Sequence, residues 1–124
     1  MNIVIIGAGK IGATLTEQLL REGHEITVVD TRTAALDAIG NTLDVMTVEG
    51  NGISMDTQVE AGVPSADLVI AVMSTDESNL LSCLIAKRLG VGNTIARVRN
   101  PEYTSGLHLI QDALGLSMAL NPEL

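Results

Sequence analysis

Stretches of unbroken apolar residues alternate with amphipathic stretches along the chain. Apolar runs of this kind are typical of parallel strands buried on both faces, and we expect strands at residues 2–6, 25–30, 44–48, 66–72, 94–99 and 116–120. Apolar residues at helical spacing predict helices between them, at residues 10–21, 31–39, 55–60, 75–89 and 107–114. Alternating strands and helices predict an α/β fold with a doubly wound, mostly parallel six-stranded sheet and helices on both faces.

A glycine-rich turn joins the first predicted strand to the first predicted helix. Gly7, Gly9 and Gly12 have the G-x-G-x-x-G spacing of a dinucleotide-binding turn, in which phosphates meet the N–H groups at a helix N-terminus. Asp30 closes the second strand, near the offset of about 20 residues at which an acid binds ribose hydroxyls. An ordinary glycine turn is the alternative. Because strand, glycines, helix, second strand and acid are all in register, a Rossmann-like nucleotide-binding unit is favoured.

Ligands of a doubly wound sheet bind in the crevice at the carboxyl ends of its strands. The segments that follow the predicted strands therefore supply the candidate nucleotide-binding residues: Gly7, Ala8, Gly9, Lys10, Ile11, Gly12, Asp30, Thr31, Arg32, Gly50, Asn51, Met73, Ser74, Thr75, Asn79, Arg97 and Arg99. Asp30 would repel a 2′-phosphate, so NAD is favoured over NADP.

Several of these candidates also have a structural interpretation. Arg32 either touches the adenosine end of a nucleotide or is a solvated side chain in the first turn of a helix. The Gly50-Asn51 turn either borders the nucleotide or is a plain turn. Arg97 and Arg99 are two residues apart and leave the same side of the predicted strand. They form either an anion clamp, on this chain's ligand or on a neighbour's, or part of a salt-bridged edge strand.

Two short segments have the residue pattern of a helix cap and of a turn. Ser74 and Glu77 have the spacing of a capping box, so Ser74 either caps the following helix or faces the nucleotide. The segment Asn100-Pro101-Glu102-Tyr103 is typical of a turn.

Composition and charge exclude some classes of partner. The 124 residues carry a formal net charge of −8, which argues against nucleic acid or an anionic membrane surface as the main partner. No apolar run approaches the ~18 residues of a membrane span, and the opening strand lacks the features of a signal peptide. Cys83 is the only cysteine, so no internal disulfide can form, which fits a reducing cytosol.

The chain offers few residues for catalysis. Hydride transfer needs an acid or base poised beside the nicotinamide, together with a substrate pocket. His24 precedes the second strand, at the end of the sheet away from the crevice, and His108 lies in the last predicted helix. Cys83 lies in an apolar helical setting that is typical of a packed hydrophobe. A regulatory binding domain is therefore favoured, and a cofactor-binding fragment of an NAD-dependent oxidoreductase is the alternative.

Two segments carry a more specific resemblance. TDESN at residues 75–79 and IARVRNPEY at residues 95–103, with the glycine turn and the second strand, resemble the N-terminal RCK (KTN) domains of the bacterial Trk-system potassium uptake family. The resemblance covers essentially the whole chain. It implies a single domain, residues 1–124, without the C-terminal regulatory domain that usually follows in that family.

The resemblance implies a regulatory subunit and not an enzyme. Its ligand would be NAD(H), or alternatively ATP or ADP. Its partners would be further copies of itself, as a dimer or a ring-forming tetramer, and a membrane potassium transporter. Such a protein is cytoplasmic and reaches the inner face of the cell membrane only through its transporter.

The resemblance also implies roles for individual residues. Carried over by position, Gly7, Gly9 and Gly12 would hold phosphates, Asp30 the ribose, Arg32 and the Gly50-Asn51 turn would lie near the adenosine, Thr75 would border the ligand, and Arg97 and Arg99 would reach phosphates or the partner subunit. Many family members have Asp where this chain has Asn51.

Overall fold

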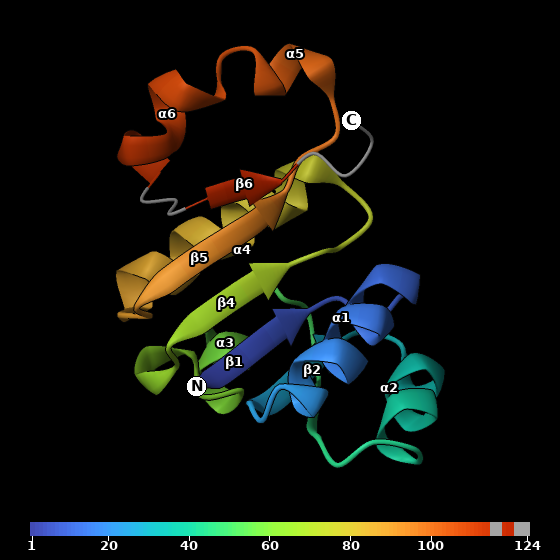
Figure 1. The fold of residues 1–124 in the computed structure, drawn as a ribbon. Coiled ribbons are helices and arrows are strands. Elements are labelled where there is room, and N and C mark those ends of the chain that lie inside the picture. Colours follow the sequence, from blue (N-terminus) through green and yellow to red (C-terminus); the bar gives the residue numbers. More distant parts are fainter. Residues whose placement is uncertain (115–117, 121–124) are drawn as a thin grey trace.

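A parallel β-sheet forms the centre of the molecule (Figure 1). The computed structural model describes residues 1–114 and 118–120. The strands lie in the spatial order β3 (Met46–Glu49), β2 (Glu25–Asp30), β1 (Asn2–Ile6), β4 (Leu68–Ala71), β5 (Asn93–Arg97) and β6 (Met118–Leu120). Every neighbouring pair is parallel. The chain crosses from one side of β1 to the other between β3 and β4, so the carboxyl ends of β1 and β4 flank the switch point.

Helices cover both faces of this sheet. The helices between the strands are α1 (Lys10–Arg21), α2 (Thr33–Gly40), α3 (Met55–Glu60) and α4 (Asp76–Leu89). A short 3₁₀ helix, η1 (Val63–Ser65), follows α3, and α5 (Pro101–Thr104) and α6 (Leu107–Leu114) follow β5. Successive residues of a strand point to opposite faces, and β1 divides accordingly. Ile3 and Ile5 pack with the α1 and α2 side chains, whereas Val4 and Ile6 pack with those of α4. The predicted α/β fold with a parallel sheet and helices is confirmed.

The end of the sheet beyond β5 is only partly described. Met118, Ala119 and Leu120 pair with Ile95, Ala96 and Arg97 as the short β6. The rest of the strand expected at 116–120 lies outside the described residues. Within the described part of the chain, no helix has the length and apolar character needed to cross a bilayer.

The structure rules out one of the two interpretations of Ser74 and corrects two local expectations. The N-cap of α4 is Thr75, whose hydroxyl accepts the N–H of Ser78 at 3.2 Å, so the pair Ser74 and Glu77 does not form the capping box. The segment expected as a turn forms the short helix α5, which the Asn100 side chain caps by accepting the N–H of Glu102 at 2.9 Å. The strand β5 ends at Arg97. Arg99 therefore lies in the following loop and not on the strand beside Arg97.

Candidate functional site

The glycine turn owes its shape to two of its three glycines. Gly7 has a φ of +119°, and a Cβ there would lie 2.7 Å from the carbonyl oxygen of Val72. A Cβ on Gly12 would lie 1.8 Å from the carbonyl oxygen of Gly7. These two positions therefore need glycine for the close packing of β1, α1 and β4. A Cβ on Gly9 would meet only the Arg32 guanidinium, at 3.8 Å, so the fold itself does not require glycine there.

Gly9 is also where α1 begins. It is the N-cap of this helix, it makes no side-chain cap, and the first turn carries no acidic residue. The first N–H groups of a helix have no partner within the helix, and the helix dipole adds partial positive charge at this end. The open space at Gly9 thus gives an anionic ligand access to backbone donors.

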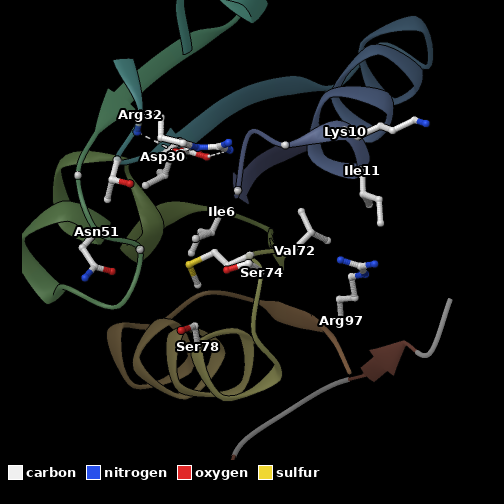
Figure 2. Close-up of a pocket in the computed structure, with 17 residues that line it drawn as sticks. Ile6, Lys10, Ile11, Asp30, Arg32, Asn51, Val72, Ser74, Ser78 and Arg97 are labelled. Carbon is white, nitrogen blue, oxygen red and sulfur yellow. Dashed lines mark hydrogen bonds and ion pairs between the residues drawn. The ribbon is translucent and has the colours of Figure 1, made fainter. Parts of the chain in front are cut away.

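A cavity of about 720 Å³ opens beside this turn, at the carboxyl ends of the strands (Figure 2). Twelve of the sequence candidates line it: Gly7, Gly9, Lys10, Ile11, Asp30, Thr31, Arg32, Gly50, Asn51, Met73, Ser74 and Arg97. The sequence interpretation missed five further lining residues: Ile6, Val29, Gly52, Val72 and Ser78. Three of these are the apolar ends of predicted strands and could have been found as the floor of the crevice.

The loop after β3 closes one side of the cavity. Gly52 packs so tightly on the floor that a Cβ there would lie 2.1 Å from the Ile6 side chain. The fully buried Gln58 side chain holds this loop, because its amide donates to the carbonyls of Gly52 at 2.8 Å and Ser82 at 3.0 Å. The position of the Gly50-Asn51 turn is therefore tied to α4 through Gln58.

Asp30 is the most heavily hydrogen-bonded group in the cavity. Its carboxylate accepts the backbone N–H of Ala8 at 2.7 Å and that of Arg32 at 2.8 Å. It also forms an ion pair with Arg32, whose Nε and Nη2 each donate at 3.0 Å. Burial alone would raise the pKa of Asp30, but the hydrogen bonds from Arg32 and Ala8 and the Arg32 charge outweigh it and lower the pKa to about 2. Asp30 is thus an ionised acceptor at neutral pH.

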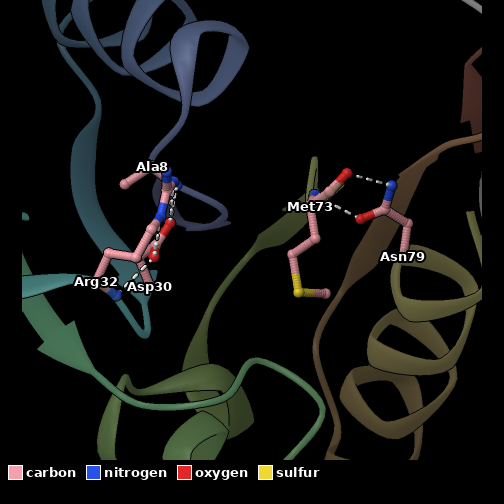
Figure 3. A network of polar contacts seen from close by, with 5 residues as sticks. All are labelled: Ala8, Asp30, Arg32, Met73 and Asn79. Atoms are coloured by element: carbon pink, nitrogen blue, oxygen red, sulfur yellow. Dashed lines mark hydrogen bonds and ion pairs between the residues drawn. The ribbon is translucent and has the colours of Figure 1, made fainter. Parts of the chain in front are cut away.

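Asn79, a sequence candidate, does not line the cavity. The side chain is 1% exposed, accepts the N–H of Met73 at 2.6 Å, and donates to the carbonyls of Met73 at 3.2 Å and Arg97 at 2.9 Å. Figure 3 shows its paired contacts with Met73. The amide is therefore used within the protein, to hold the loop after β4.

Four other candidates also lie outside the cavity lining. Ala8 takes part only through its N–H to Asp30, and Gly12 lies behind the turn against Gly7. Thr75 caps α4. The Arg99 guanidinium donates to the carbonyl of Ser74 at 2.8 Å, so Arg99 braces the loop after β4.

Asp76 fixes the loop that carries Arg99. Its carboxylate, at the start of α4, accepts the backbone N–H of Arg99 at 3.0 Å and that of Asn100 at 2.7 Å. Asp76 is 7% exposed. Sequence reasoning did not single it out, because the N–H groups that it binds belong to a segment 23 residues further along the chain.

Arg97 lies across the cavity from the pair formed by Asp30 and Arg32 (Figure 2). Its Nε is buried and has no hydrogen-bond partner. The Lys10 side chain, in contrast, extends away from the cavity, so this residue contributes its backbone. The site thus offers backbone donors and the Arg97 guanidinium to an anion, and on its other side carries the ion pair of Asp30 and Arg32.

The sequence of the chain matches the model of the TrkA-N domain over residues 3–122. The chain belongs to the TrkA-N domain family. A Trk system potassium uptake protein TrkA homolog from Methanothermobacter thermautotrophicus is 32% identical and aligns with 99% of this chain and 55% of its own length. TrkA from Halomonas elongata is 41% identical over 99% of this chain and 27% of its own length. The chain therefore spans between about a quarter and about half of these relatives.

Solved structures share the fold of this TrkA-N domain. The TrkA-N domain of the Escherichia coli inner membrane protein ybaL superposes with a TM-score of 0.85 at 18% identity, covering 98% of this chain and 87% of that one. The GsuK channel bound to NAD superposes with a TM-score of 0.80 at 24% identity, covering 98% and 21%. GsuK bound to ADP gives 0.80 at 23% identity, covering 97% and 31%.

Proposed function

We propose that this TrkA-N domain binds NAD(H), or alternatively ATP or ADP, and thereby regulates a membrane potassium uptake transporter. The observation that carries the proposal is the cavity at the switch point, where the open glycine turn faces Asp30. The curated relatives are potassium uptake proteins, and a channel of the same fold binds NAD in one structure and ADP in another.

Each part of a nucleotide has a matching part of the cavity. The N–H groups at the start of α1 and the space at Gly9 suit a diphosphate. Asp30, which is ionised, suits the hydroxyls of a ribose. The Gly50-Asn51 turn lies where the adenine would extend, and Arg97 suits a second phosphate or a group from a partner subunit.

A binding role fits the lining better than a catalytic one. General acid–base catalysis works best with a pKa near the operating pH, and hydrogen bonds lower the pKa of Asp30 to about 2. Among the described residues that line the cavity there is no histidine, cysteine, tyrosine or glutamate. A regulatory site needs only a difference in ligand affinity between two states of the assembly.

The assembly is part of the proposal. Residues 1–124 act as the RCK N-terminal domain of a homo-oligomer, a dimer or a ring-forming tetramer, on the cytoplasmic side of the transporter. NADH and ATP compete for the one cavity and favour different arrangements of the subunits, with Arg97 as the phosphate-sensing side chain.

Titration calorimetry with NADH, NAD, ATP and ADP tests the binding. A ligand at 100 times its Kd adds about 2.7 kcal/mol to the stability of the folded state, so thermal unfolding gives a second readout. Asp30→Ala should lose the ligands held through ribose. Asp44→Ala is the matched control, because Asp44 is an exposed carboxylate at the other end of the sheet. No heat and no stabilisation with all four nucleotides would refute the proposal.

A second experiment separates regulation from catalysis. Deletion of the protein should lower potassium uptake by the cell, and the wild-type protein should restore it, whereas Asp30→Ala should not. Turnover of NADH with any member of a panel of small carbonyl substrates would instead support the oxidoreductase alternative.

A further inference from the structure

The ribose position of the candidate site is already occupied by a side chain of the protein itself. A carboxylate offers about four acceptor positions, and all four of Asp30 are filled. One oxygen accepts the N–H of Arg32 and its Nε, and the other accepts the N–H of Ala8 and the Nη2 of Arg32. A hydroxyl group can bind Asp30 only if one of these donors leaves.

The two kinds of donor differ in how readily they can leave. The N–H groups of Ala8 and Arg32 belong to the backbone of the glycine turn and of the segment after β2, so their positions are set by the fold. The guanidinium is held by a flexible side chain that is 62% exposed. The Asp30 side chain is only 8% exposed, but the guanidinium lies largely in water and loses little when it returns there fully. Ligand binding would therefore displace the guanidinium and keep the backbone contacts.

The guanidinium makes the same pair of contacts that a ribose needs. Its Nε donates to one oxygen of Asp30 and its Nη2 to the other, both at 3.0 Å. A vicinal diol also offers two O–H donors that can bind the two oxygens of one carboxylate. Removal of the guanidinium therefore leaves two acceptors, which is the number that the 2′- and 3′-hydroxyls require.

We propose that Arg32 closes the ribose subsite of the unliganded protein, and that an adenosine ligand binds Asp30 only by displacing this guanidinium. This inference rests on the proposed function and names a further specificity-determining residue of that site. A ligand without a ribose diol gains nothing from opening the pair. Arg32 therefore reduces the preference for ribose-bearing ligands over ligands that use only the phosphate donors.

The test compares ADP with 2′,3′-dideoxy-ADP, which lacks both hydroxyls. The affinity for ADP alone is not a clean readout. Nη2 of Arg32 also lies beside Gly9, so the guanidinium could contact a phosphate after it leaves Asp30. The ratio of the two dissociation constants cancels any phosphate contact that both ligands make. It isolates what the diol contributes.

Calorimetry should be performed on the wild type, Arg32→Met and Arg21→Met. Methionine keeps the length of the apolar stem and removes every donor, while the backbone N–H of residue 32 stays in place. Arg21 is the matched control, because it is also exposed and also forms an ion pair, with Glu17, away from the cavity. The ratio of Kd for dideoxy-ADP to Kd for ADP should rise about threefold or more in Arg32→Met and stay unchanged in Arg21→Met.

The outcomes separate this inference from the proposed function. If the wild type binds ADP but the ratio is unchanged or smaller in Arg32→Met, the inference is overturned and the proposed function stands. If none of the three proteins binds ADP, ATP, NAD or NADH, both fail. Should Arg32→Met not fold, the arginine Nε–H resonance of the wild type gives the same test. ADP should shift this resonance and inorganic pyrophosphate should not, and an identical response to both would overturn the inference.

Discussion

Asn79 donates its side-chain amide to the backbone carbonyl of Arg97 at 2.9 Å, and through the same side chain it pairs with both backbone polar groups of Met73. One buried amide on α4 thus joins the segment after β4 to the end of β5. These two segments carry Ser74 and Arg97, which line the far side of the cavity. The position of Arg97 relative to the glycine turn therefore depends on Asn79.

Asn79→Asp should destabilise the protein by about 2–3 kcal/mol, since it keeps the shape but removes the donors to the carbonyls of Met73 and Arg97 and buries a charge. Urea denaturation measures the change. Asn51→Asp is the matched control on an exposed loop, where the side chain acts as an acceptor for the N–H of Ile53 at 3.1 Å. It should change the unfolding free energy by less than about 0.5 kcal/mol. Equal effects of the two substitutions would contradict the structural role of Asn79.

Asn79 also shows where prediction from the sequence reaches its limit. It follows β4 at the carboxyl end of the sheet, where an amide is as suitable for a ligand as for a neighbouring backbone. Whether the amide faces the ligand or the backbone depends on where α4 begins, because an error of one residue in the helix start rotates a side chain by about 100°. The cap at Ser74, one of the two interpretations of that residue, lies one residue before the observed cap at Thr75.

The glycine turn and Asp30 could be predicted because their roles depend on local spacing within one βαβ unit. The pairing of Asp30 with Arg32 could not, although the two are only two residues apart. Both side chains were assigned to the ligand, and nothing in the spacing shows that they bind each other first. The clamp made by Asp76 on the N–H groups of Arg99 and Asn100 was missed because it joins segments 23 residues apart.

Gly12→Ala should mainly reduce the stability of the fold, whereas Gly9→Ala should mainly reduce ligand binding. The new Cβ at position 12 meets a backbone oxygen at 1.8 Å, so the strand and helix must separate, and we expect a loss of more than about 3 kcal/mol or no folding. At position 9 the nearest atom is the flexible end of Arg32 at 3.8 Å. The free energy of unfolding of Gly9→Ala should therefore lie within about 1 kcal/mol of the wild-type value. The variant should nevertheless bind ADP at least about tenfold more weakly, because the new methyl group occupies the space through which the phosphates approach the turn.

Thermal unfolding and calorimetry on the same two variants check these expectations. A Gly9→Ala protein that binds ADP as the wild type does would show that the phosphates do not approach this turn. A Gly12→Ala protein of normal stability would contradict the close packing of α1 on β1.

The thiol of Cys83 should not react in the folded protein. Cys83 is fully buried on α4, and burial raises the pKa of its thiol to about 12, so the nucleophilic thiolate is scarce at neutral pH. A maleimide reagent at pH 7 should label the protein only as fast as it unfolds, and labelling should be complete in urea. Rapid labelling without denaturant would show that the β4–α4 layer opens in the native state.

Asp30 should make the stability of the protein depend on acid pH. Its pKa is about 2 in the folded protein, below the ordinary aspartate value of 3.8, so the unfolded chain takes up the proton first as the pH falls. The stabilisation is therefore fully present above about pH 5 and is lost between about pH 4 and pH 2, for a total of about 2 kcal/mol.

Other carboxylates titrate in the same range, so the measured quantity is a difference between proteins. The free energy of unfolding of the wild type should fall between pH 5 and pH 2.5 more steeply than that of Asp30→Asn. Arg32→Met should lie between the two, because the guanidinium supplies part of the interaction and the N–H of Ala8 remains. Asp37→Asn, which removes an exposed carboxylate of α2, controls for the loss of one charge. If the wild type and Asp30→Asn lost stability in parallel, the carboxylate would not be held by these donors in solution, and the closed ribose subsite would lose its physical basis.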